Sequence, residues 1–80
     1  METGMRRVYV VDGVGGIEIK GLERGDITVC YGYTEAMYNV MYPILQGRGR
    51  FDGRFKNWIV FSQHCEEVLK ALDGVARRVV

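Results

Sequence analysis

The sequence contains little of what catalytic and metal sites need. It has one histidine, His64, and two cysteines, Cys30 and Cys65. The cysteines form no Cys-x-x-Cys pair or Cys/His cluster, so their spacing predicts no zinc site. No second base or orienting carboxylate accompanies His64, so a catalytic triad cannot be built around it. We therefore predict no enzymatic activity, no catalytic residue, no metal, no cofactor and no small-molecule substrate.

Long apolar runs and a large net charge are also absent. No stretch reaches the roughly 18 apolar residues of a membrane span, and residues 1–7 lack the apolar core of a signal peptide. These absences predict a cytoplasmic protein with no membrane partner. The net charge of +1 excludes a generally polycationic binder of the histone-like kind. Any contact with a polyanion must therefore be local.

What the chain does contain indicates one small folded domain. Its 80 residues are 48% apolar, which argues against disorder and predicts a single domain over residues 1–80. We expect residues 1–5 to be disordered, as chain termini often are. Cys30 and Cys65 both lie in apolar patterns and are predicted to be buried free thiols, with a disulfide between them as the alternative.

Four segments have the composition of strands. They are β-branched or aromatic and alternate in polarity, and they span residues 7–11, 17–20, 27–31 and 57–61. Glycine-rich turns separate the first three, which predicts an antiparallel meander. The turn at residues 12–16 also invites comparison with a phosphate-binding glycine loop. It lacks the G-x-G-x-x-G order and a strand follows it, so a tight turn is the better interpretation.

Two segments have helical periodicity. The first follows Thr34, an expected N-cap, and should kink or end near Tyr42 because Pro43 comes next, with Gly47 as its limit. The second is expected to be capped by Ser62 and to stop at Gly74. The predicted fold is therefore α+β, in the order β-β-β-α-β-α. It has a four-stranded, mainly antiparallel sheet with two helices on one face. The tail at residues 75–80 could be frayed helix, edge strand or loose chain.

Alternation along the strands predicts one face under the helices and one open face. The expected core face carries Val8, Val10, Ile17, Ile19, Ile27, Val29 and Tyr31. The open face is expected to carry Arg7, Tyr9, Lys20 and Thr28. In the fourth strand both faces are apolar, so either Trp58 and Val60 or Ile59 and Phe61 should be partly exposed. Such a patch would stack on unpaired bases, form a homodimer interface or lie under the C-terminal tail.

The segment with the strongest functional signal is residues 47–58, where cations alternate with glycines and aromatics. Four of the eleven Lys and Arg residues lie here against one acid, Asp52, which gives a local charge of +3. Guanidinium groups bind phosphate bidentately, and glycines let backbone N–H groups approach it. A solvated hairpin tip is the competing interpretation. We predict about four phosphate contacts from this segment, through Arg48, Arg50, Arg54 and Lys56.

Residues 27–75 also resemble the HARP domain, a compact module attached to annealing helicases. The resemblance lies in three short motifs: Tyr33-Thr34-Glu35 opening a helix, Gly49-Arg50-Phe51-Asp52 as a turn, and Lys56-Asn57-Trp58 starting a strand. Phe61 departs from it, since relatives often have proline there. The resemblance implies binding of branched or partly single-stranded DNA without catalysis, with Arg50 and Lys56 as contacts. Phe51 and Trp58 would pack in the core.

Two functions follow as hypotheses. The first is a non-catalytic nucleic-acid-binding module, with DNA a better fit than RNA, that uses the basic segment and extends over the open face through Arg7, Tyr9 and Lys20. The second is a homo-oligomeric protein-interaction or accessory protein that uses an exposed apolar sheet face. A salt-dependent affinity for oligonucleotides distinguishes the first from the second.

Overall fold

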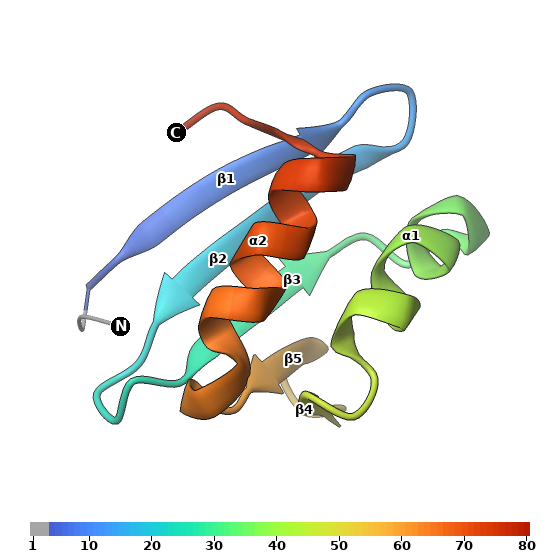
Figure 1. The fold of residues 1–80 in the computed structure, drawn as a ribbon. Helices are drawn as coiled ribbons and strands as arrows, with labels where there is room; N and C mark the ends of the chain where they lie inside the picture. The colour runs from blue at the N-terminus through green and yellow to red at the C-terminus, as the bar shows by residue number, and fades with distance from the viewer. Residues whose placement is uncertain (1–3) are drawn as a thin grey trace.

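The computed structural model describes residues 4–80, which form one α+β domain. Its strands are β1 (Arg6–Val11), β2 (Gly15–Gly21), β3 (Ile27–Tyr31), β4 (Gly49–Asp52), β5 (Asn57–Val60) and β6 (Arg77–Arg78). Its helices are α1 (Glu35–Leu45) and α2 (Cys65–Val75), and a single 3-10 turn, η1 (Ser62–His64), precedes α2. Both helices lie against the same face of one sheet (Figure 1). The α+β class with two helices is therefore confirmed.

The sheet has six strands among the described residues, rather than the predicted four, in the order β4-β5-β3-β2-β1-β6. All five strand pairs are antiparallel. One extra strand, β4, lies inside the predicted basic loop and includes Gly49–Asp52, the motif expected to be a turn. The other, β6, comes from the C-terminal tail and pairs with β1. Both are short edge strands, whose pairing depends on a tertiary neighbour and gives little signal in the sequence.

The first helix begins as predicted and ends later. The Thr34 hydroxyl accepts a hydrogen bond from the Met37 N–H at 3.1 Å, which is the expected N-cap. The helix passes through Pro43 to Leu45 instead of ending near Tyr42. Its last turn is closed by the Gln46 N–H bonding to the Tyr42 carbonyl. Gly47 then adopts a φ of 77°, a left-handed conformation that suits glycine and turns the chain away.

The second helix differs slightly from its expected bounds. Ser62, the expected cap, belongs to η1, and its N–H donates to Asp26 Oδ1 at 2.8 Å. Helix α2 starts at Cys65 and continues past Gly74 to Val75. Cys65 is buried as predicted, whereas Cys30 is exposed, which corrects the expectation that both thiols are buried. Cys30 lies opposite Glu18 in the sheet, on the face that the helices do not cover.

The core lies between the sheet and the two helices. Strand β1 contributes Tyr9 and Val11, because Tyr9 pairs with Ile17 and therefore shares its face. The prediction that Val8 and Val10 face the core and Tyr9 faces solvent is wrong. The other buried apolar residues are Ile17, Ile19, Ile27, Val29, Met37, Met41, Ile44, Leu45, Val60, Cys65, Val68, Leu69 and Leu72. Strand β1 is apolar on both faces, so its own sequence does not select between them; the register with β2 does.

Of residues 1–5, which were expected to be disordered, residues 1–3 lie outside the described residues. Met5 packs against the core, and its carbonyl accepts a hydrogen bond from the Gly21 N–H at 2.8 Å. None of the described helices is both long and apolar enough to cross a membrane.

Candidate functional site

The basic segment folds into the β4–β5 hairpin. The two strands pair from Gly49 opposite Val60 to Asp52 opposite Asn57, and residues 53–56 form the turn. Asp52 Oδ1 accepts the Arg54 N–H at 2.9 Å, which closes the turn, and Lys56 has a φ of 53°. Gly49 is required at its position because a Cβ would lie 2.9 Å from Val60 Cα and closer still to the Ile59 carbonyl oxygen.

Three of the four predicted phosphate-binding cations are exposed on this hairpin. Arg54 and Lys56 lie in the turn, and Arg50 lies in β4. The Arg54 guanidinium sits 5.8 Å from the centroid of the Phe55 ring, which is 68% exposed. None of the three makes an ion pair with a carboxylate of residues 4–80. Their charges are therefore available to an external anion.

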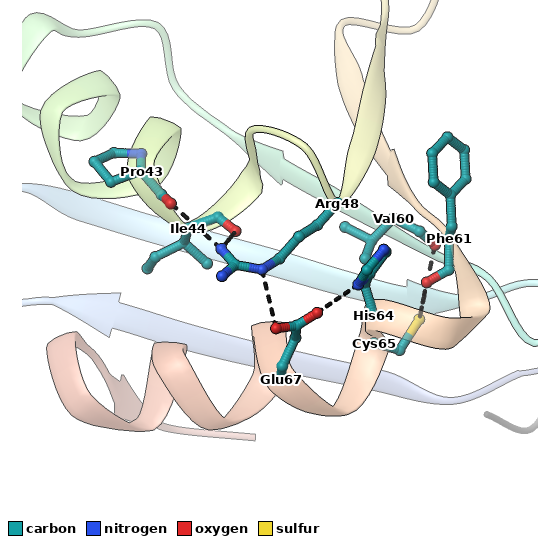
Figure 2. Close-up of polar contacts among 8 residues, drawn as sticks. All are labelled: Pro43, Ile44, Arg48, Val60, Phe61, His64, Cys65 and Glu67. Carbon is teal, nitrogen blue, oxygen red and sulfur yellow. Dashed lines mark hydrogen bonds and ion pairs between the residues drawn. The ribbon is translucent and has the colours of Figure 1, made fainter.

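Arg48 is engaged within the protein instead. Its Nη1 donates to the Ile44 carbonyl at 2.8 Å and is 3.4 Å from the Pro43 carbonyl, at the C-terminal end of α1. Its Nε lies 3.2 Å from Glu67 Oε2 on α2 (Figure 2). A cation at this position satisfies carbonyls that the helix leaves without donors. The geometry gives Arg48 a structural role between the helices.

On the open face, the sheet register aligns one residue from each of five strands. Across the sheet the row runs Arg50, Ile59, Thr28, Lys20 and Arg6. Lys20 and Arg6 share a carboxylate, Glu18, at 3.6 Å and 2.8 Å. The hydrogen bond from Arg6, helped by the charges of Lys20 and Arg6, lowers the pKa of Glu18, and together these effects outweigh the opposing effect of desolvation. The row therefore holds three cations and continues the basic hairpin across the uncovered face.

Two residues expected on the open face lie elsewhere. Tyr9 is fully buried, so it has no surface to offer a partner. Arg7 lies opposite Ile19 on the helix-covered side, where its Nη1 is 3.3 Å from the Tyr9 hydroxyl. Since strand neighbours alternate, the β1 register that places Tyr9 inside also places Arg6, rather than Arg7, on the open face.

A second feature, which the sequence does not predict, is a cavity of about 290 Å³ between α1 and the hairpin. We call it the aromatic pocket. It is lined by Thr34 and by six of the nine aromatic residues of the chain: Tyr31, Tyr33, Tyr38, Tyr42, Phe51 and Trp58. It lies on the helix-covered side of the sheet, because Tyr31 pairs with the buried Ile17 and Trp58 pairs with the buried Val29. The i, i+4 spacing of Tyr38 and Tyr42 was the one available signal.

Ring contacts hold the walls of the aromatic pocket. Tyr38 and Tyr42 stack with centroids 4.9 Å apart, and Tyr42 meets Trp58 edge to face at 6.2 Å. Phe51 packs edge to face on Trp58 at 6.1 Å and on Tyr33 at 5.9 Å. Such pairs each add about 0.5–1.5 kcal/mol beyond their burial. Burial raises the pKa of the Tyr31 hydroxyl, so that phenol is neutral at physiological pH.

The groups with possible nucleophilic or acid–base chemistry lie apart from the aromatic pocket. His64 Nδ1 contacts Glu67 Oε1, and the Cys65 thiol donates weakly to the carbonyls of Val60 and Phe61 (Figure 2). Burial raises the pKa of the Cys65 thiol, which disfavours the reactive thiolate. Within residues 4–80, no three His, Cys, Asp or Glu side chains group closely enough to hold a metal ion.

The chain matches no family model, no curated protein and no solved structure.

Proposed function

We propose that this domain is a non-catalytic nucleic-acid-binding module directed at single-stranded or branched DNA. The observation that carries the proposal is how the cations are used. Four of them are paired with carboxylates in the described structure: Arg6, Lys20, Arg48 and Arg77. Seven described cations have no such partner. Arg50, Arg54 and Lys56 cluster on one hairpin, whereas the other four are spread over β1, the β2–β3 turn, α2 and β6: Arg7, Arg24, Lys70 and Arg78.

Phosphate is the anion that suits this arrangement. Guanidinium groups donate two parallel hydrogen bonds to phosphate oxygens, and a sugar–phosphate backbone offers such groups in series. Lys20 and Arg6 extend the cationic surface along the row across the open face, although each shares Glu18. The resemblance of residues 27–75 to the HARP domain implies the same ligand class.

Neither described helix is suited to contact base edges in a duplex groove, which favours binding without base-specific contacts. Helix α1 carries no Lys or Arg, and α2 carries only Lys70 against three acids, so neither helix has the cationic side that a groove-binding helix presents to DNA. The three clustered cations lie instead on a short hairpin, a position suited to contacts with a sugar–phosphate backbone. The domain should therefore hold phosphates at many sequences with similar affinity.

A salt titration tests the proposal. Labelled single-stranded, duplex and forked DNA, and single-stranded RNA, are titrated at two or more salt concentrations. Three phosphate contacts on a single strand give a log–log slope of about −2, at roughly 0.7 per contact. This is smaller than four contacts would give, because Arg48 is internally paired. We expect the single-stranded and forked DNA to bind more tightly than the duplex.

Two matched double variants separate the effect of the hairpin contacts on DNA affinity from the effect of net charge. Arg50→Glu with Arg54→Glu should remove most of the affinity and flatten the slope. Arg24→Glu with Lys70→Glu makes the same change in net charge at exposed positions of the β2–β3 turn and α2, and should retain most of both. An affinity indifferent to salt and to the hairpin variants argues against the proposal.

The rival function is a homo-oligomeric interaction protein. The observation in its favour is that the open face is uncovered and carries the half-buried apolar residues Val8, Val10 and Ile59 among its charges. Light scattering across a concentration series is the test. A salt-insensitive dimer that binds none of the oligonucleotides would favour the rival.

A further inference from the structure

The aromatic pocket lies beside two of the three cations that carry the proposed function, Arg54 and Lys56 in the hairpin turn. Its residues Phe51 and Trp58 are a cross-strand pair of the hairpin, one residue pair before the turn that presents Arg54 and Lys56. A β-strand rises about 3.3 Å per residue, so the turn lies only a few ångströms from the pocket. One strand of nucleic acid can therefore reach both. A backbone held by the turn would therefore bring its bases to the pocket.

We infer that the aromatic pocket receives one unpaired nucleobase of the bound strand, an inference that rests on the proposed function. Its volume of about 290 Å³ lies at the lower limit of ligand pockets, which hold about 300–1,000 Å³. That volume suits one small flat group. A base within a duplex is stacked and paired, so only an unpaired base can enter.

The chemistry of the pocket walls fits a base held by its flat faces. Every lining side chain except Thr34 is aromatic. The Thr34 hydroxyl already accepts the Met37 N–H. Every base has a π face, so stacking tolerates any sequence. The pocket thus selects for unpaired strand rather than for base identity.

The positions of the rings suit a ligand that enters from solvent. Tyr33 is 60%, Tyr38 is 52% and Phe51 is 44% exposed, so these three rings form the rim. Trp58 and Tyr42 are half-buried and are braced by each other and by their neighbours. Because these two rings of the floor are already held in place, ligand binding immobilises few side chains, which reduces the entropic cost of binding.

A methylated ammonium is the other ligand that aromatic walls suit. The charges near the pocket disfavour it. Two acids adjoin the lining residues in sequence, Glu35 and Asp52, and Asp52 is occupied by the Arg54 N–H. Against them stand Arg54 and Lys56 in the turn and Arg50 on the far side of β4. This surface repels a cation and attracts a base that carries its phosphate.

The experiment uses Trp58, the single tryptophan of the chain, as a reporter inside the pocket. A thymidine oligonucleotide and an abasic chain with the same number of phosphates are titrated at fixed salt. We expect the thymidine strand to quench Trp58 fluorescence and to bind more tightly. The abasic chain should bind with the same salt slope and little quenching. Choline is titrated in parallel.

The variants are chosen to leave the fold intact. Tyr38→Ala and Tyr33→Ala remove exposed rim rings, and each should weaken thymidine binding about 5- to 100-fold. Neither should change abasic binding. Phe61→Ala removes a partly exposed ring outside the pocket and should change neither.

The outcomes distinguish failure of the base pocket from failure of the proposed nucleic-acid binding. Equal affinity for the thymidine and abasic strands, or rim variants without effect, overturns the base pocket and leaves the phosphate-binding hairpin standing. Quenching by choline without quenching by the oligonucleotide overturns it in favour of an ammonium site. Binding of neither strand overturns both the pocket and the proposed function.

Discussion

Arg48 and Glu67 join the end of one helix to the start of the other. Arg48 follows α1 and donates to its final carbonyls, while its Nε lies 3.2 Å from Glu67 Oε2 in the first turn of α2. Glu67 also contacts His64, so one carboxylate receives two partners (Figure 2). The most basic segment of the chain therefore contributes one cation to stability and three to its surface.

Replacing Arg48 should affect stability rather than binding. Arg48→Ala leaves the Ile44 carbonyl without its donor and Glu67 without a cation, and should lower the free energy of unfolding by about 1–2 kcal/mol. Urea denaturation measures this, with Arg24→Ala as the control at an exposed turn. The salt slope for DNA should stay unchanged. A flattened slope in folded Arg48→Ala would return this residue to the phosphate-binding set.

The Glu67 cluster should make part of the stability depend on pH. The hydrogen bond from His64, helped by the charge of Arg48, holds the pKa of Glu67 below its ordinary value of 4.5, and together these effects outweigh the opposing effect of desolvation. A carboxyl whose pKa is lowered by folding stabilises the fold fully above its unfolded value. This contribution is lost as the pH falls below about 4.5 through the folded pKa.

The test compares wild type with Glu67→Gln across this range. The wild type should be the more stable at pH 7, and the difference should shrink between pH 4.5 and pH 3. Gln63→Ala, an exposed change without a titrating group, serves as the control. A difference that stays constant over this interval would contradict the linkage.

Gly49 should tolerate no side chain, because the backbone of β5 at Ile59 and Val60 occupies the space that a Cβ would need. In Gly49→Ala the added Cβ would lie 2.9 Å from Val60 Cα and nearer to the Ile59 carbonyl oxygen, so the hairpin must shift. We expect a loss of about 1–3 kcal/mol on thermal or urea unfolding, together with weaker DNA binding. Gly53→Ala in the turn meets nothing within 4 Å and should remain within about 0.5 kcal/mol of wild type.

The two cysteines should differ sharply in reactivity. Cys30 is exposed on the open face, whereas Cys65 is 2% exposed and burial raises the pKa of its thiol. A thiol reagent under native conditions should therefore label one site quickly and the second only on unfolding. Cys30→Ser should abolish the fast phase. Rapid labelling of Cys65 in that variant would show that its thiol is not buried in the folded protein.

Local signals in the sequence determined much of this protein. The Thr34 cap, the helical periodicity after it and the alternation in residues 17–20 and 27–31 all appear in the structure as predicted. Each of these depends on neighbours within a few residues, so the sequence carries them directly. The concentration of cations in residues 47–58 was likewise visible without a structure.

The tertiary structure decided which residues form surfaces. Val8 and Val10 compete evenly with Tyr9 and Val11 for the core, and only pairing with β2 places Tyr9 inside and Arg6 outside. Arg48 does not belong with the freely exposed cations of the hairpin, because the packing of α2 places Glu67 beside it. The aromatic pocket joins rings from β3, the β3–α1 loop, α1 and the hairpin, which are up to 27 positions apart. A sequence lists these rings, but packing alone brings them together.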